Sequence, residues 1–217
     1  PREIHSTYLV SHANFIACHQ QFLLEKFNML EKAVDGATFL LNTLSKPEEA
    51  WSALPKVYQE EIIKKNIKFY VIDAYDVGKK TGMGVRINTI MQTCFFAISG
   101  VLPKDEAIEF IKGAIKKTYG KKGDRIVQMN FNAVDQTLEH LFEVKVPSAI
   151  SSAIEMPLAV PENSPQFVKD VVAKIAVRKG DQIPVSAFSV DGTFETGTTQ
   201  FDKRNIAMEI PAWDEDV

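Results

Sequence analysis

The chain has 217 residues, 45% hydrophobic and 24% charged, which is enough to bury the core of one α/β domain, with or without an appendage. Its net charge of −3 and pI near 5.9 argue against nucleic acid or an anionic membrane as partners. No apolar run approaches the ~20 residues of a membrane-spanning helix and no signal-peptide pattern opens the chain, so we expect a cytoplasmic protein.

The first third of the chain alternates between strand and helix patterns. Short apolar runs of β type predict strands at residues 8–10, 15–18 and 37–42. Apolar residues at helical spacing predict helices at residues 20–34, 47–54 and 56–66. Pro47 suits the first turn of the second helix, and Pro55 ends it.

The middle third continues this alternation. The apolar run at 67–73 predicts a third buried strand, which a linker carrying Gly82 and Gly84 follows. Further helices are expected at residues 87–99, 103–119 and 125–141. The order of strand and helix is typical of crossovers over a parallel sheet, so we predict a Rossmann-like α/β domain. Because no convincing strand and ligand-binding loop open it, we expect its N-terminal part to be missing.

The start of the helix at 87–99 is the first candidate for a ligand site. Glycines, Arg86, Asn88 and Thr89 gather there. Free N–H groups and the positive end of the helix dipole favour an anionic or polar ligand. The alternative is a tight turn that enters a core helix, because Gly-x-Gly without a further glycine is a weak fingerprint.

Two other features could be functional or structural. Asn130 lies on the apolar side of the helix at 125–141, where its amide must find a hydrogen-bonding partner or a ligand. The basic turn Tyr119-Gly-Lys-Lys-Gly123 ends a helix, where its lysines would complement the helix dipole.

The chain changes character at Pro147. Residues 147–166 are rich in proline, serine and alanine, as in a linker or a surface-wrapping segment. A helix is expected at 164–174, and the last 40 residues look irregular, with too few periodic apolar residues for a core of their own. We therefore divide the chain into a domain at 1–147 and an extension at 148–217 that lies on a larger partner surface.

Known catalytic patterns are missing from the sequence. His5, His12, His19 and His140 lack metal-ligand spacing, and there is neither a nucleophile elbow nor a Walker loop. The two cysteines at 18 and 94 lie in apolar segments and read as core thiols of a reducing compartment. Residue chemistry alone predicts an α/β domain for a polar or nucleotide-like ligand.

Several longer stretches resemble pyruvate:ferredoxin (flavodoxin) oxidoreductases. Those in the predicted domain are Phe15-Ile-Ala-Cys-His19, Phe39-Leu-Leu-Asn42, the run at 84–96, Ile98-Ser-Gly-Val-Leu-Pro103, the run at 117–123 and Asn132-Ala-Val-Asp135. Those in the extension are the runs at 180–188 and 191–204. The second ends in Asp202-Lys203-Arg204, where the family carries Glu-Lys-Arg.

The resemblance implies a fragment of a large, homodimeric enzyme that decarboxylates pyruvate on thiamine diphosphate with Mg. Electrons would pass through [4Fe-4S] clusters to ferredoxin or flavodoxin, and coenzyme A would take up the acetyl group. This chain would be the family's gamma-type domain, which contributes to the coenzyme A site, plus the segment that leads to a ferredoxin-like domain. The thiamine, the metal and the clusters would be bound by other domains, and the family's Gly-rich loop would precede residue 1.

Carried over to matching positions, the resemblance implies that Asn88 and Asn130 contact coenzyme A, with Arg86 as a further candidate for phosphate. Carboxamides can donate and accept hydrogen bonds, and the guanidinium fork pairs with phosphate oxygens. An ion pair with a nearby carboxylate is the alternative for Arg86. Two rival functions stay open: a scaffold that only braces other domains, and a free-standing nicotinamide-binding domain, which the missing G-x-G-x-x-G argues against.

Overall fold

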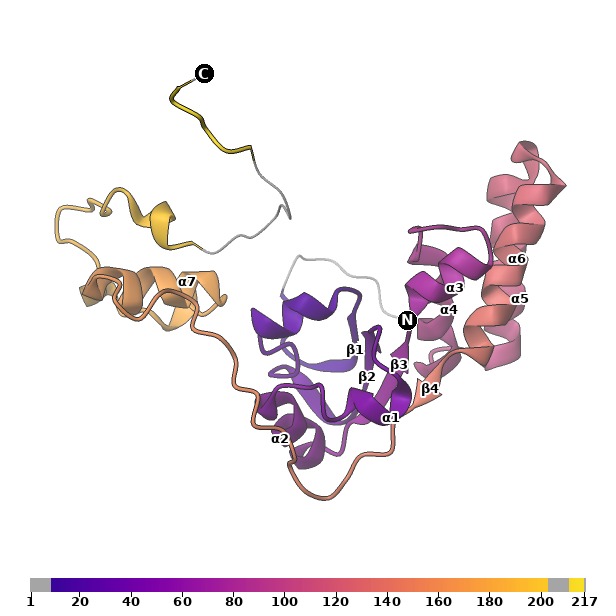
Figure 1. The fold of residues 1–217 in the computed structure, drawn as a ribbon. Helices are drawn as coiled ribbons and strands as arrows, with labels where there is room; N and C mark the ends of the chain where they lie inside the picture. The colour runs from indigo at the N-terminus through magenta and orange to yellow at the C-terminus, as the bar shows by residue number, and fades with distance from the viewer. Residues whose placement is uncertain (1–8, 203–210, 217) are drawn as a thin grey trace. The chain divides into compact units, whose positions relative to one another are not determined.

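The computed structural model describes residues 9–202 and 211–216 and divides the chain into two compact units, Pro1–Met156 and Pro157–Val217 (Figure 1). Lys203 and Arg204 of the Asp-Lys-Arg stretch lie outside the described residues, as do His5 and Tyr8.

A four-stranded sheet in the order β1-β2-β3-β4 forms the centre of the first unit. β1 (Ala13–Cys18), β2 (Ala33–Asn42) and β3 (Lys68–Ile72) run parallel, and β4 (Phe142–Glu143) pairs antiparallel with β3. Leu41 lies opposite Cys18 on one side and Val71 on the other. The carboxyl ends of all three parallel strands therefore lie at the same end of the sheet.

Helices cover both faces of this sheet (Figure 1). The helices on one side are α1 (Pro47–Ala50) and α2 (Lys56–Lys64). Those on the other are α3 (Ala74–Lys80), α4 (Asn88–Ile98) and α6 (Asp124–Glu139), and α5 (Lys104–Tyr119) packs on α4 and α6. The prediction of a parallel α/β domain is confirmed. Its strands are almost continuously apolar because helices lie on both faces of the sheet.

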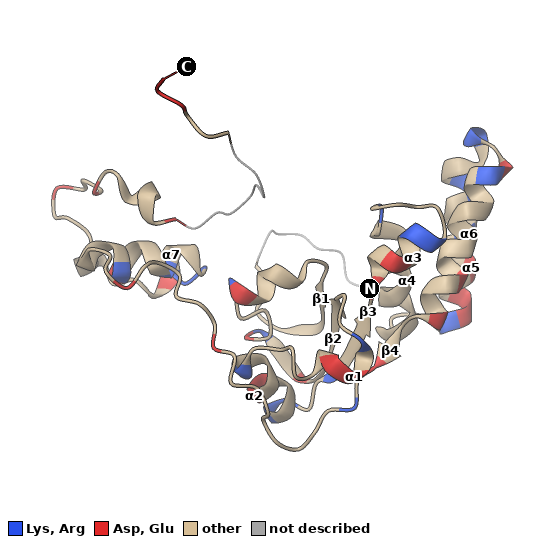
Figure 2. Ribbon diagram, in the orientation of Figure 1, with Lys and Arg blue, Asp and Glu red and all other residues tan. Residues whose placement is uncertain are grey.

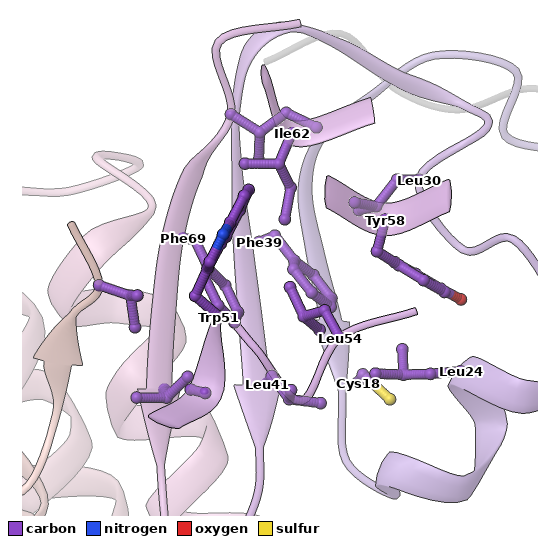
Figure 3. Close-up of a cluster of buried hydrophobic side chains, with 14 of the residues drawn as sticks. Cys18, Leu24, Leu30, Phe39, Leu41, Trp51, Leu54, Tyr58, Ile62 and Phe69 are labelled. Atoms are coloured by element: carbon purple, nitrogen blue, oxygen red, sulfur yellow. The ribbon is translucent and has the colours of Figure 1, made fainter. Parts of the chain in front are cut away.

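Alternate side chains of the strands supply the two cores. Phe39 and Phe69 stack with ring centroids 5.5 Å apart on the α2 side, where Tyr58 stacks on Phe39 at 6.3 Å (Figure 3). Leu40 and Ile72 point to the other face and pack with residues of α3 and α4. Because each face buries its own apolar set, a one-residue slip of β2 would turn each set toward the wrong core.

A buried carboxamide ties the chain after β4 to α2. Gln59 is 0% exposed, and its Oε1 accepts from the N–H groups of Ser151 at 2.8 Å and Ser152 at 3.0 Å. Its Nε2 donates to the Trp51 carbonyl at 2.7 Å. The backbone N–H of Lys56 also donates to Ile154 O at 2.8 Å. We call residues 151–154 the latched segment.

Several sequence predictions about individual elements were wrong. Residues 20–34 form only a 3-10 helix (Gln21–Glu25) before β2 begins at Ala33. The linker after β3 begins with an unpredicted helix, α3, and β4 was also missed. Leu9 and Val10 belong to no strand and are exposed.

The second unit contains little regular structure, in agreement with the prediction. A π-helical turn (Val168–Val172) continues into α7 (Ala173–Ala176), close to the helix expected at 164–174. Three 3-10 turns follow: Gly180–Gln182, Val185–Ala187 and Thr198–Phe201. The Phe167 and Phe194 rings meet edge to face at 5.0 Å.

Candidate functional site

The loop between α3 and α4 is held in a defined shape before it reaches the predicted ligand site. Gly84 adopts φ +62°, a left-handed conformation that glycine tolerates best. Its N–H donates to Gly78 O at 3.0 Å, which ties the loop back onto α3. Met83 is buried in the core beside the sheet, so the loop delivers the chain to the start of α4 from an anchored position.

The N-terminus of α4 is partly exposed, because Thr89 and Ile90 in its first turn are buried. Ile87 occupies the N-cap position without a side-chain cap, and Arg86 and Asn88 are exposed. The first intrahelical bond runs from Met91 N to Ile87 O, so the N–H groups of residues 88–90 have no acceptor within the described part of the chain. These N–H groups and the helix dipole, equivalent to roughly half a positive charge, favour an anion.

Asn130 lies on α6, buried at 2% exposure among apolar residues. Its Nδ2 donates to Ile126 O at 2.8 Å, which is the structural partner that the sequence analysis left open. Its Oδ1 is buried and has no hydrogen bond within the described residues. The preceding residue, Met129, lies against the α3–α4 loop, because a Cβ on Gly82 would be 3.4 Å from its Sδ.

The basic turn lies where α5 passes into α6, and lysines and arginine gather at this end of the two helices (Figure 2). Lys116, Lys117, Lys121 and Lys122 belong to the last turn of α5 or to the 3-10 turn after it. Lys122 Nζ sits 5.5 Å from the centroid of the Tyr119 ring. The position at a helix C-terminus suits the dipole-complementing role.

Both cysteines are buried and free, as predicted. Burial raises the pKa of the Cys18 thiol to about 11 and that of Cys94 to about 12. Thiols in this state are poor nucleophiles and poor metal ligands. Among residues 9–202 and 211–216, no three His, Cys, Asp or Glu side chains are grouped to hold a metal ion. Within the same residues, no helix combines the length and apolar character needed to cross a membrane.

A second polar region, which sequence reasoning missed, lies at the carboxyl ends of β1 and β2. A cavity of about 210 Å³ opens there. Its lining residues are His19, Gln20, Gln21, Phe22, Asn42, Thr43, Leu44 and Tyr75. Ligands of open α/β sheets bind outside the carboxyl ends of the strands. Polar residues directly after two of the predicted strands, those at 15–18 and 37–42, were the sequence signal that could have found it.

Hydrogen bonds hold several of the lining residues of this cavity in place. Asn42, 3% exposed, donates through Nδ2 to His19 O at 3.0 Å and accepts at Oδ1 from Ala74 N at 2.9 Å. The Thr43 hydroxyl donates to Gln21 Oε1 at 2.6 Å. One amide thus joins the end of β1 to the start of α3, and the threonine orients a glutamine at the rim.

Two family models match the two parts of the chain. Residues 1–140 match a family model described as pyruvate ferredoxin/flavodoxin oxidoreductase. Residues 153–207 match a second model, named EKR and described as a domain of unknown function.

Curated relatives match along nearly the whole chain. A putative pyruvate-flavodoxin oxidoreductase of Synechocystis sp. is 56% identical over 100% of the chain, and the pyruvate-flavodoxin oxidoreductase of Rhodospirillum rubrum is 49% identical over 100%. The pyruvate:ferredoxin oxidoreductase of Moorella thermoacetica is 47% identical over 97%. The chain spans only 18% of the length of each of these relatives.

Among solved structures, the PORC subunit of pyruvate oxidoreductase from Thermotoga maritima is 19% identical, with a TM-score of 0.48 over 63% of this chain and 67% of that one.

Proposed function

The chain belongs to the pyruvate ferredoxin/flavodoxin oxidoreductase family, and we propose that it is part of a longer enzyme that converts pyruvate and coenzyme A to acetyl-coenzyme A and CO2. Ferredoxin or flavodoxin would accept the electrons. The observation that carries this proposal is 49–56% identity to two such oxidoreductases over the full length of the chain. We place the enzyme in the cytoplasm as a homodimer, without nucleic acid or membrane as a partner.

The contribution of this chain is to bind coenzyme A and to pack against other domains. Arg86 and Asn88 are exposed beside N–H groups of α4 that have no acceptor among the described residues, which suits a phosphate or an amide of the coenzyme. Neither residue makes or breaks bonds in the reaction. They would position the coenzyme so that its thiol meets the acetyl group.

Asn130 is the third proposed contact. Its Nδ2 is used by Ile126 O, so a ligand would approach the buried Oδ1, which can accept from an N–H or O–H donor. This contact needs access between α6 and its neighbours, whereas Asn88 is already open to solvent. The two asparagines should therefore respond differently to substitution.

The redox groups of the proposed reaction do not fit this chain. A [4Fe-4S] cluster needs about four thiolate ligands, whereas the chain has two cysteines, both buried with raised pKa values. We therefore assign the clusters to other domains of the longer protein, and the family resemblance implies that thiamine diphosphate and Mg bind there as well. Residues 1–147 would form the coenzyme-binding domain, and residues 148–217 would lead to a ferredoxin-like domain.

Titration of the longer enzyme with coenzyme A tests this assignment. Asn88→Ala should raise the apparent KM for coenzyme A about 3- to 10-fold, as for one lost hydrogen bond, and Arg86→Ala about 10- to 100-fold. Gln92→Ala is the matched control, because Gln92 is an exposed carboxamide one turn further along α4.

The readout that separates positioning from general damage is coenzyme-independent decarboxylation of pyruvate, measured as CO2 release. It should be unchanged in the Asn88 and Arg86 variants. Equal loss of both half-reactions would refute the assignment. Titrations indifferent to Arg86, Asn88 and Asn130 would instead support the scaffold function.

A further inference from the structure

The outer side of α5 carries a row of exposed residues. The inner side of the helix, with Ile111 and Ile115, packs on α4 and α6. The row on the opposite side consists of Glu106, Phe110, Gly113 and Lys117, all of them exposed. Phe110 is a large apolar side chain with 66% of its surface exposed. Among the described residues, no element covers this row.

The spacing and the sizes in this row suit contact with another helix. Its members follow one another after four, three and four residues, which is the spacing of a coiled-coil seam. A Cβ on Gly113 would meet nothing within 4 Å, so this position leaves a hollow on the helix surface. Phe110, one turn before it, projects as a knob. One helix thus carries both a knob and a hole.

We propose that this face of α5 pairs antiparallel with α5 of a second copy of the chain. A two-fold axis midway between residues 111 and 112 places Phe110 opposite the partner's Gly113. The same axis places Glu106 opposite the partner's Lys117. Because a two-fold interface uses one surface twice, each of these contacts occurs twice. The row is therefore complementary to itself.

The charges along α5 favour this orientation. Acidic residues occupy its first half and basic residues its last turn: Asp105, Glu106 and Glu109, then Lys116 and Lys117. None of these five side chains forms an ion pair within the described residues. Antiparallel pairing brings the acidic half of each helix to the basic half of the other, whereas parallel pairing would bring like charges together. Exposed ion pairs contribute little to affinity, but they select orientation.

The α5 pair is one part of a larger interface. A helix of 16 residues is about 24 Å long, so its contact is well below the ~800 Å² per partner of a stable interface. Other domains of the longer enzyme must supply the rest of the buried surface. The inference therefore rests on the homodimer of the proposed function and is tested in the longer enzyme.

Disulfide cross-linking of a Glu106→Cys/Lys117→Cys variant tests the pairing. Mild oxidation should join position 106 of one copy to position 117 of the other, giving a covalent dimer whose cross-linked peptide is identified by mass spectrometry. The two positions are 11 residues apart, about 16 Å along one helix, which is too far for a disulfide within a copy. Gln128→Cys/Glu139→Cys is the matched control, because these exposed positions have the same spacing on α6 and should not cross-link.

A third substitution tests the packing of the knob into the hole. Gly113→Leu, added to the Glu106→Cys/Lys117→Cys variant, fills the hollow that Phe110 of the second copy needs. The cross-linked fraction should fall about fivefold or more through overpacking. An unchanged fraction would overturn the proposed packing.

Sedimentation velocity of the same enzyme separates this inference from the proposed homodimer. An enzyme that sediments as a dimer but forms no disulfide between positions 106 and 117 refutes the α5 pair and leaves the homodimer standing. An enzyme that sediments as a monomer refutes both.

Discussion

Two buried asparagines show how far a single residue can be understood from the sequence. Asn42 and Asn130 both sit among apolar neighbours, which signals a hydrogen-bonding need. Asn42 meets that need on both sides, with His19 O and Ala74 N. Asn130 meets it only through Nδ2. The need is visible in the sequence, but the partners are not, because they come from the ends of other elements.

The two thiols should react slowly in the native protein. With pKa values of about 11 and 12, Cys18 and Cys94 are almost entirely protonated at pH 8, and only the thiolate reacts. We expect iodoacetamide labelling of both to be at least 100-fold slower in the native longer protein than after denaturation. Peptide mapping by mass spectrometry measures each cysteine separately. Native labelling of Cys18 as fast as in the denatured protein would contradict its burial.

The raised pKa of a buried thiol also makes the stability of the fold decrease at alkaline pH. The folded state raises the pKa of Cys94 from 9.0 to about 12, so folding favours the protonated thiol. Its contribution to stability is complete below pH 9 and is lost as the pH rises from 9 toward 12. The free energy of unfolding should therefore fall over this range and fall less steeply in a Cys94→Ala variant.

At the scale of elements, strong periodicity predicted α4, α5 and α6 closely. Short elements were missed because their apolar pattern covers too few residues, although Asp73, which caps α3 by accepting from Asp76 N at 2.9 Å, was a usable start signal. The helix predicted at 20–34 rested on apolar residues at helical spacing. In the structure its last two residues belong to β2, which pairs with β1. Tertiary pairing overrode local pattern there.

Two helical glycines should respond oppositely to alanine. A Cβ on Gly78 would clash with the carbonyl oxygen of Gly84, whereas a Cβ on Gly113 of α5 meets nothing within 4 Å. Gly113→Ala should stabilise the chain by about 0.5–1 kcal/mol, because alanine loses less entropy in a helix. Gly78→Ala should destabilise it by about 1–3 kcal/mol through overpacking.

Thermal unfolding of the 217-residue chain measures both glycine variants. The expected shifts in Tm are about +2 °C for Gly113→Ala and several degrees downward for Gly78→Ala. If the Gly78→Ala variant had the same Tm as the Gly113→Ala variant, the α3–α4 loop would have moved to make room for the added methyl group. That result would contradict a loop fixed against α3.

The latched segment depends on one side chain. Gln59→Ala removes the acceptor for the N–H groups of Ser151 and Ser152 and the donor to Trp51 O. Hydrogen exchange of the two serine amides should accelerate about tenfold or more, since each lost bond contributes about 0.5–1.5 kcal/mol. Gln128→Ala on the exposed face of α6 is the control. Unchanged exchange in Gln59→Ala would show that other contacts hold the segment.

The whole molecule combines two units of very different core size. The first unit buries three clusters of apolar side chains, whereas the described residues of the second bury only Val160, Ser164, Val168 and Val171. Units of about 60 residues are marginal even with a full core. Composition predicted this contrast, because periodic apolar residues become sparse after Pro147.

A peptide of residues 157–217 should therefore not fold alone. We expect no cooperative thermal transition by circular dichroism and no protected amides in hydrogen exchange, because the four buried side chains among its described residues cannot offset the entropy of ordering the segment. The same segment in the longer protein should contain protected amides where it contacts other domains. A sharp unfolding transition of the isolated peptide would show that the second unit is an independent domain.

The place of β1 in the sheet has a consequence for handling the chain. Within the described residues, its outer row of N–H and C=O groups faces no strand, and its sequence, Ala-Asn-Phe-Ile-Ala-Cys, carries no charge or proline. Proteins usually guard such edges with lysine, proline or a covering element. A strand edge of this composition is a template on which a foreign strand can add, so we expect aggregation of the chain on its own to begin at β1.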